Sequence, residues 1–341
     1  MVASLYSIES EKEDICIFLE QRGSGLAPVS LELLSKGREL ASHAGWTLTG
    51  LLLGYQVAGA ASEAFAYGAD RVILIDNPKL EPFTVDAYTH VAYQIMDVYR
   101  PSVFLLGATM DGRDLAGRLA VRLRTGLNAD CSGLQINAEE GRLVCEISGF
   151  GGGILALIEM KEHRPQMATV RPGVFLPSKL PHEKNGRVIR PAIEIPDEII
   201  RTRVVERIIG EGVDLTQASV LVAGGRGVEG NFDMLDDLAQ LLDGDYGATR
   251  PPVDDGFVER ERQIGQTGVV CRPNLAIVCG ISGAFHFVVG IQEADTIIAI
   301  NSDRDAPIFE YADYCIVGDV NEIIPSLIQA LRDYRVAEIP V

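Results

Sequence analysis

Short apolar runs alternate with amphipathic stretches along most of the 341-residue chain, and this alternation limits the possible folds more than any other feature. In the first half the apolar runs have the length of buried strands: 14–20, 46–53, 71–75 and 102–107. The stretches between and after them have helical spacing or composition: 28–44, 59–67, 84–99 and 114–125. Because strands joined through helices pair in parallel, we predict a parallel sheet covered by helices on both faces.

The pattern changes after residue 133. Three short strand-like runs, Leu143–Ser148, Gly153–Glu159 and Gln166–Arg171, are separated by Gly or Pro. We expect them to extend the sheet with antiparallel strands. Residues 177–202 hold four prolines among mixed charges, which predicts a linker with one crossing strand.

The alternation then restarts. A chain of this length suits two domains, and we place them at 1–200 and 201–341. Strands of the second domain are expected at 219–223, 268–271, 274–279, 296–300 and 314–317, with helices at 231–242 and 321–332. The predicted fold class is α/β, with two doubly wound parallel-sheet domains, of which the second is Rossmann-like.

Small or polar residues follow the strands of the second domain at the point where each strand ends. They are Gly224–Gly227, Ser282–Ala284, Asn301 and Asp319. The carboxyl ends of parallel strands share one edge of a sheet, where such folds bind ligands. Small residues let backbone N–H groups approach an anion, which suits a dinucleotide with its pyrophosphate. Ordinary loop composition is the alternative, because turns after strands are rich in Gly, Ser and Asn.

Gly225–Gly230 also matches the pattern G-x-G-x-x-G between a strand and a helix, with Asp243 and Asp245 at a plausible distance for a ribose contact. An NAD-dependent dehydrogenase using this loop is therefore an alternative. Arg226 is unusual in a tight phosphate turn. Moreover, only about 110 residues follow the loop, too few for a cofactor domain and a separate catalytic domain.

Two further loops, 248–252 and 263–268, are too polar and too rich in Gly for a core. Arg250 could stack on a flat ring or bind phosphate, and Gln266 and Thr267 could bond ring nitrogens and carbonyls. A solvated surface position for Arg250 is the alternative.

Several classes of function are disfavoured. The formal net charge is −18 without a Lys/Arg run, so we expect no nucleic-acid partner. None of the six cysteines forms a C-x-x-C pair, and we predict no metal-binding and no catalytic residues. No signal-like segment or membrane-length apolar run is present, so we expect a soluble, cytoplasmic protein without direct membrane insertion.

Taken in order, the motifs resemble those of the electron-transfer flavoprotein α-subunit family over nearly the whole chain. In the first half, Phe104–Thr109 and Asp111–Ala120 resemble the family's signature. In the second half, its FAD-binding signature is matched by Gly224–Gly227, Thr249–Arg250, Gly265–Gly268, Ile281–Ala284, Asn301 with Ala306–Phe309, and Asp319.

The resemblance implies FAD as the cofactor and gives roles to single residues. Arg226 and Ser282 would hold the pyrophosphate, Arg250 would lie against the isoalloxazine, and Thr267 would bond near the flavin N5. Gln266 would lie near the polar edge of the ring, and Asn301 and Asp319 would bind the adenosine end. The implied cofactor-binding set is completed by Thr249, Ile264, Gly265, Gly283, Ala284, Phe285, His286 and Phe287.

The resemblance also implies partners. The protein would work as a heterodimer with an electron-transfer flavoprotein β subunit, on which the first domain packs. It would carry electrons between a flavin dehydrogenase, of the acyl-CoA type, and a further redox acceptor or donor. The flavin performs the redox chemistry, so no acid–base pair is needed.

Two segments vary from the common family form. The usual Ser-Gly-Ala-Ile-Gln-His reads Ser282–Phe287 here, with His286 at the Gln position and Phe287 at the His position. Since Phe cannot donate a hydrogen bond, we expect the one-electron-reduced flavin to be less stabilised. His163–Gly173 is similar to forms found in anaerobes, some of which bifurcate electrons from NADH, so bifurcation is an open alternative to simple transfer.

Overall fold

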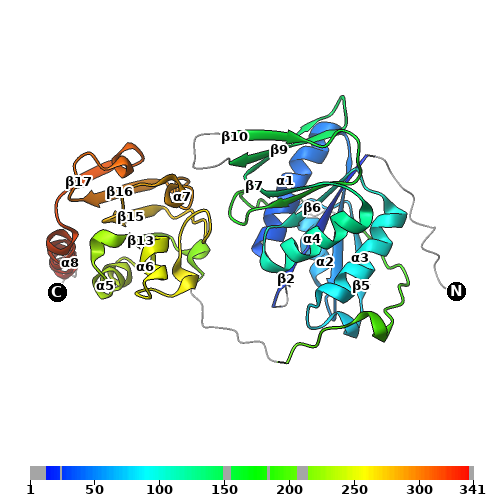
Figure 1. Ribbon diagram of the computed structural model, residues 1–341, viewed down its shortest axis with the longest axis horizontal. Coiled ribbons are helices and arrows are strands. Elements are labelled where there is room, and N and C mark those ends of the chain that lie inside the picture. Colours follow the sequence, from blue (N-terminus) through cyan, green and yellow to red (C-terminus); the bar gives the residue numbers. More distant parts are fainter. Residues whose placement is uncertain (1–12, 24, 149–154, 183–184, 206–213, 338–341) are drawn as a thin grey trace. The chain divides into compact units, whose positions relative to one another are not determined.

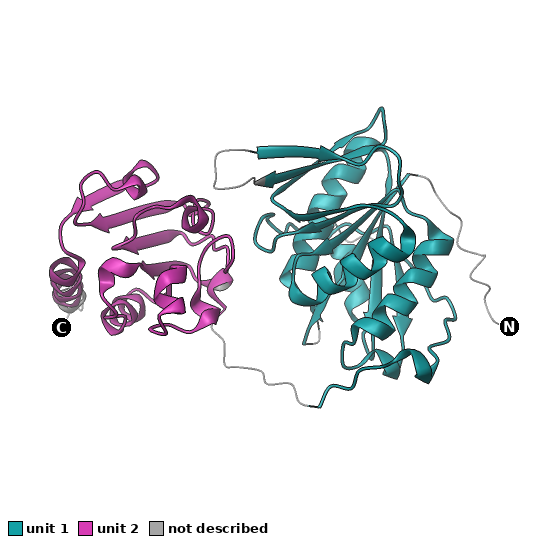
Figure 2. Cartoon of the chain, in the orientation of Figure 1, with its two compact units in different colours: residues 1–207 teal, residues 208–341 magenta. Residues whose placement is uncertain are grey.

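The computed structural model describes residues 13–23, 25–148, 155–182, 185–205 and 214–337 of the chain, and Figure 1 labels its elements. The chain divides into two compact units, residues 1–207 and 208–341, which Figure 2 shows in different colours. Each unit has a sheet and hydrophobic clusters of its own, so each is described by itself.

The first unit is built on a seven-stranded sheet in which all neighbouring strands are parallel. The order across the sheet is β12-β5-β4-β1-β6-β11-β7. The strands are β1 (Asp14–Leu19), β4 (Thr47–Gly54), β5 (Arg71–Asp76), β6 (Val103–Gly107), β7 (Leu127–Cys131), β11 (Gln166–Val170) and β12 (Arg187–Ile189). The parallel sheet predicted from the alternating pattern is thereby confirmed, and β12 is the crossing strand expected in the linker.

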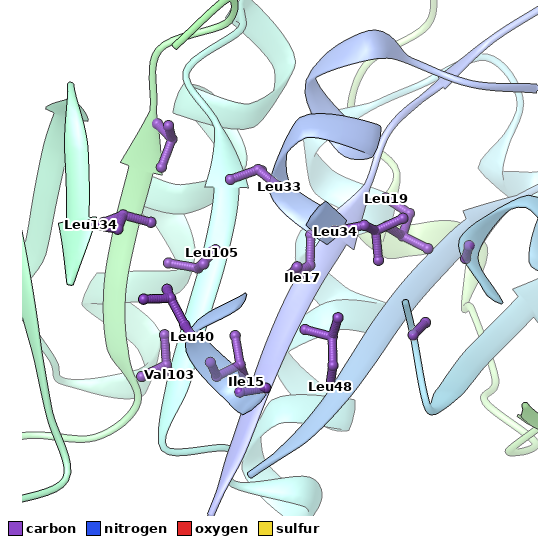
Figure 3. Packing of buried hydrophobic residues seen from close by; sticks show 14 of the residues in the cluster. Ile15, Ile17, Leu19, Leu33, Leu34, Leu40, Leu48, Val103, Leu105 and Leu134 are labelled. Carbon is purple, nitrogen blue, oxygen red and sulfur yellow. The ribbon is translucent and has the colours of Figure 1, made fainter. Parts of the chain in front are cut away.

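Helices cover both faces of this sheet: α1 (Pro28–Ala44), α2 (Ala60–Ala66), α3 (Val85–Tyr99) and α4 (Met110–Leu123). α1 begins with a proline at its first position and ends where Gly45 adopts the left-handed conformation, with φ 73°. Its Leu33 and Leu34 share a cluster with Ile17 of β1 (Figure 3). α3 and α4 bury apolar residues in a second cluster with the alternate side chains of the same strands. Each fully buried Leu contributes about 1.5–3 kcal/mol.

A separate antiparallel sheet of three strands accompanies the main sheet: β8 (Gly133–Asn137), β9 (Arg142–Ser148) and β10 (Leu155–Glu159). The expectation that the runs at 143–148, 153–159 and 166–171 extend the main sheet as antiparallel strands is therefore wrong. β9 and β10 pair outside it, and β11 lies inside it, parallel to β6 and β7. All five residues of β11 are buried, which suits an interior strand. A short hairpin, β2 (Gln21–Arg22) and β3 (Gly25–Leu26), completes the strands of this unit.

The second unit has a five-stranded parallel sheet in the order β14-β13-β15-β16-β17. The strands are β13 (Val220–Gly224), β14 (Asp245–Ala248), β15 (Leu275–Cys279), β16 (Thr296–Asn301) and β17 (Tyr314–Val317). The helices are α5 (Asp233–Leu241), α6 (Arg250–Asp254), α7 (Phe285–Val288) and α8 (Val320–Ala337). Separate apolar clusters line the two faces of the sheet. Both units are thus parallel α/β folds, as the sequence predicts.

The strand order fixes where a ligand can enter this sheet. In chain order it runs 2-1-3-4-5, so the connections reverse direction between β13 and β15. At such a reversal the loops after the two strands diverge and leave a crevice at the carboxyl edge. β14 was not foreseen from the sequence, whereas the strand expected at 268–271 is absent: Val269 forms only an isolated bridge to Ile264.

Candidate functional site

A cavity of about 730 Å³ opens at the carboxyl edge of the second unit's sheet, where the strand order reverses. The loops that follow β13, β14, β15 and β16 each form part of its wall. Its lining residues are Gly225, Arg226, Thr249, Arg250, Pro251, Gln263, Ile264, Gln266, Thr267, Gly280, Ile281, Ser282, Ala284, His286, Phe287, Asn301, Asp303, Ala306 and Pro307. The volume lies in the range of small-molecule and cofactor sites, roughly 300–1,000 Å³.

Glycines bring the loops after β13 and β15 into backbone contact. Gly225 N donates to Cys279 O at 2.9 Å, and Gly227 N donates to Gly280 O at 3.1 Å. A Cβ atom on Gly225 would lie 2.4 Å from Gly280 O, and Gly280 itself has φ 61°. No side chain fits between these turns, so the backbone of both loops is exposed to whatever occupies the cavity.

Positive charge reaches the cavity from two of its loops. Arg226 opens the short 3₁₀ turn Arg226–Val228, and its side chain forms no hydrogen bond or ion pair with the part of the chain that the structure describes. Arg250 is the first residue of α6 and pairs with Asp254, with Nε 3.0 Å from Oδ2. Asp303 is the acidic residue among those that line the cavity. The lining is therefore suited to an anion such as a pyrophosphate.

The loop 263–268 forms another wall and is held from two sides. Gln263, only 7% exposed, donates from Nε2 to Thr267 Oγ1 at 2.9 Å. Gln266 N donates to His286 O at 2.7 Å, and Gln266 Oε1 lies 2.5 Å from His286 Nδ1. Gly265, at φ 130°, allows this contact, because a Cβ there would lie 2.4 Å from His286 O.

Asn301 joins the loops after β15 and β16. Its Nδ2 donates to Ile281 O at 2.8 Å, and its Oδ1 accepts from Asp303 N at 3.0 Å. The same amide therefore fixes the turn that carries Ser282 and the turn that carries Asp303.

Most of the residues predicted from the sequence meet at this one cavity. They are Arg226, Thr249, Arg250, Ile264, Gln266, Thr267, Ser282, Ala284, His286, Phe287 and Asn301. Gly265, Gly283 and Phe285 lie next to lining residues without lining the cavity themselves. Asp319 also does not line it; its Oδ1 accepts from Asn321 N at 2.8 Å at the start of α8. Its contact with an adenosine stays a prediction.

The residues that the predicted set missed lie beside it: Gly225, Pro251, Gln263, Gly280, Ile281, Asp303, Ala306 and Pro307. Gly225, Ile281, Ala306 and Pro307 lie inside the matched motifs although they were not in the implied cofactor-binding set, and the other four lie one or two positions from a motif. The ribose contact considered for Asp243 and Asp245 has no support from their positions. Both lie at the amino end of β14, whereas Thr249 at its carboxyl end lines the cavity. Gly230 packs against Phe257 and is not part of the lining.

Two further observations concern the described parts of both units. No group of three or more His, Cys, Asp or Glu side chains there is arranged to hold a metal ion. No helix among the described residues is both long enough and apolar enough to cross a membrane.

A flavodoxin-like strand order, a Gly-walled crevice at the switch point and two arginines define a nucleotide-cofactor-binding α/β protein. Family models narrow this class. Residues 15–195 match the electron transfer flavoprotein domain, and residues 214–292 match the electron transfer flavoprotein FAD-binding domain. The chain belongs to the electron-transfer flavoprotein α-subunit (FixB) family, and its cofactor is FAD.

Similar curated proteins extend over almost the full length. The chain is 43% identical over 330 residues to the electron transfer flavoprotein subunit alpha of Clostridium acetobutylicum, covering 95% of this chain and 98% of that protein. It is 43% identical to the protein FixB of Clostridium saccharobutylicum, covering 96% and 99%. It is 38% identical to the acryloyl-CoA reductase electron transfer subunit beta of Anaerotignum propionicum, covering 94% and 96%.

Proposed function

We propose that the chain is the FAD-carrying α subunit of a heterodimeric electron carrier. It receives electrons from a flavin dehydrogenase of the acyl-CoA type and passes them to another redox protein. The observation that carries this proposal is the cavity at the β13–β15 switch point, with Arg226 and Arg250 at its wall. The name of the Anaerotignum relative, an electron transfer subunit of acryloyl-CoA reductase, supports the acyl-CoA link.

The residues present fit FAD by shape and charge. The turns at Gly225 and Gly280 leave no room for a side chain, so their backbones can approach a pyrophosphate. The Arg226 side chain has no hydrogen-bond or ion-pair partner in the described chain, and a guanidinium forms strong, charge-assisted hydrogen bonds with phosphate oxygens. We assign Arg226 and Ser282 to the pyrophosphate. FAD, when bound, supplies the redox chemistry by taking up and releasing electrons.

The loop 263–268 and α6 would set the surroundings of the flavin ring. Because Thr267 Oγ1 accepts a hydrogen bond from Gln263, its own hydrogen is available to be donated to a ring atom. Arg250 brings a positive charge that favours negative charge on the ring. Asn301, held by Ile281, would contact the adenosine end.

Binding of FAD tests the proposal directly. The chain is produced together with the β subunit, whose contact surface we assign to the first unit, and the bound flavin is counted by absorbance. We expect a yellow protein with one FAD for each α chain. Arg226→Gln should lower FAD affinity by about tenfold, the loss of one charge-assisted contact. Arg260→Gln, an exposed arginine of the same unit outside the cavity, should leave affinity unchanged. A colourless protein that binds NAD would support the dehydrogenase alternative instead.

Electron bifurcation is a second candidate, favoured by one observation. This observation is the sequence of the segment His163–Gly173, which resembles forms found in anaerobes. Under this candidate a second FAD would sit mainly in the β subunit. Two FAD for each reconstituted heterodimer, with reduction by NADH, would support it, and a single FAD would leave only simple transfer.

A further inference from the structure

A pocket of about 460 Å³ lies in the first unit, at the edge opposite to the carboxyl ends of its strands. α3 and α4 both end there, and the chain enters β11 beside it. The lining residues are Tyr93, Met96, Asp97, Arg100, Arg122, Leu123, Arg124, Arg164 and Pro165. Arg164 and Pro165 belong to the segment His163–Gly173, but no FAD-binding motif and no residue assigned to FAD lies in this pocket.

Four arginines converge on the pocket without a carboxylate partner. Arg100 donates from Nε to Asp97 O at 2.8 Å, and Arg164 donates to the main-chain oxygens of Met160, His163 and Gly141. Arg122 and Arg124 have no side-chain hydrogen bond within the described chain. None of the four forms an ion pair there, although the whole chain has 48 acidic and 30 basic residues.

Main-chain contacts hold the guanidinium groups in place but do not cancel their charge. Burial, and after it repulsion from Arg142, lowers the pKa of the Arg164 guanidinium, so the positive charge there is held at a cost. An anionic ligand would remove that cost and would bond the planar forks of the guanidinium groups.

Helix ends explain only part of this arrangement. Arginine is favoured at a helix C-terminus, which carries about half a negative charge. Arg100 and Arg124 are the residues that follow α3 and α4. The pocket has four positive guanidinium groups. The carboxylate of Asp97 and the partial negative charges of two helix ends offset about two of these charges, so about two positive charges remain. That excess matches a phosphate dianion.

The floor of the pocket is apolar. Met96 is 1% exposed, Pro165 is buried, and Leu123 and Tyr93 are half-buried. A rim of arginines over such a floor suits an organic phosphate, with its apolar or flat group below and its phosphate above. A free acidic peptide would match the rim but leave the floor uncovered.

We propose that this pocket of the first unit binds the phosphate dianion of a small organic molecule. The four arginines hold the phosphate, and the floor of Met96, Leu123 and Pro165 takes the organic part. The site lies in a different unit from the FAD cavity and its occupation does not depend on FAD.

The test uses the full-length, FAD-loaded chain, so that the FAD cavity is already filled. Binding of phenyl phosphate and of inorganic phosphate is measured by calorimetry at low and at high salt. We expect both to bind, phenyl phosphate several-fold more tightly, and both more weakly at high salt. Arg122→Gln with Arg124→Gln should weaken binding at least about tenfold. The matched control is Arg113→Gln with Arg118→Gln, which removes two charges from the same helix outside the pocket, where they pair with Asp130 and Asp86.

Each outcome decides the proposal. Loss of binding in the first pair only, with FAD content and thermal unfolding unchanged in both, supports it. Equal loss in both pairs would mean attraction by overall surface charge and would overturn it. Equal affinity for phenyl phosphate and inorganic phosphate would overturn the claim that the floor of the pocket binds an organic group. Binding of a Glu-rich peptide that neither phosphate displaces would overturn the proposal and assign the arginines to a protein partner.

Discussion

His286 and Gln266 are joined twice, through their side chains and through the main chain. His286 Nδ1 lies 2.5 Å from Gln266 Oε1, and His286 O accepts from Gln266 N at 2.7 Å. With Oε1 as the acceptor, Nδ1 carries a ring hydrogen. Both residues line the FAD cavity, while the neighbouring Phe287 also belongs to the hydrophobic cluster below it.

His286 and Phe287 are expected to make the half-reduced flavin less stable than it is with the common family order Gln-His at these positions. Phe287→His, combined with His286→Gln to restore the common family order, places a donor where the chain has none. We expect the half-reduced form to accumulate several-fold more during stepwise dithionite reduction followed by absorbance. His286→Gln alone should not increase it. Abundant half-reduced flavin in the unchanged chain would contradict the expectation.

The flavin potential should respond in opposite directions to the two partners Arg250 and Asp254. Arg250→Gln removes a positive charge from the cavity wall and should lower the midpoint potential. Asp254→Asn removes the carboxylate 3.0 Å from Arg250 Nε and should raise it. Both side chains are more than half exposed, so the shifts should be on the order of tens of millivolts, with little change in folding stability. The midpoint potentials are measured by potentiometric titration. Shifts of the same sign in both variants would show that the charge of Arg250 does not act on the flavin ring.

Much of the fold could be predicted from the sequence, because the spacing of apolar residues in a long segment indicates whether it forms a helix or a strand. α1 was predicted at its observed bounds from the spacing of its leucines, and in the structure a proline opens it and a glycine follows its last residue. β14 was missed because Asp-Tyr-Gly-Ala is short and only partly apolar, and only pairing with β13 makes it a strand. The direction of β11 could not be read either, since an apolar run is compatible with parallel and antiparallel neighbours.

The site was predictable where it follows a recognisable strand. Asn301 comes directly after an apolar run and Ser282 comes three residues after one, and the structure brings both to the cavity. Gln263 was not in the predicted set, because its 7% exposure depends on contacts that are remote in sequence. The chain there bridges to Ala248 at the end of β14, the strand that was itself missed. The assignment of Arg250 to the site came from the motif resemblance. Spacing alone could not have given it, because an arginine in a loop is most often a surface residue.

Comparing substitutions of Gly283 and Gly256 should show whether FAD binding depends on the shape of the cavity wall or on backbone strain. Gly283 has φ 91°, and a Cβ there would lie 2.2 Å from Ile308 N, so Gly283→Ala must displace the turn that carries Ser282. Gly256 has a similar φ of 80° with open space around it, so Gly256→Ala carries only the left-handed strain, about 1–2 kcal/mol. We expect loss of FAD retention on gel filtration for the first variant and retention for the second. Equal FAD loss in both would mean that strain, not the cavity wall, matters.

Glu20, which follows β1 in the first unit, should make the stability of that unit depend on pH. Burial raises the pKa of Glu20 to about 7; the hydrogen bond from Thr109 opposes the rise and the charge of Asp111 adds to it. Glu20 Oε1 is buried without a hydrogen-bond partner. Because the pKa in the folded state is raised above its ordinary value of 4.5, the stability that Glu20 contributes is complete below pH 4.5. It is then lost as the pH rises through about 7.

Glu20→Gln should therefore unfold with nearly constant stability from pH 5 to 8, while the unchanged chain weakens by up to about 3 kcal/mol over that range. Urea unfolding is followed by the fluorescence of Trp46, the single tryptophan, which lies in the same unit as Glu20. Glu39→Gln, at an exposed glutamate of α1 paired with Lys36, is the control and should follow the unchanged chain. If the curves of Glu20→Gln and the unchanged chain run parallel from pH 5 to 8, the buried carboxyl is already ionised in the folded state.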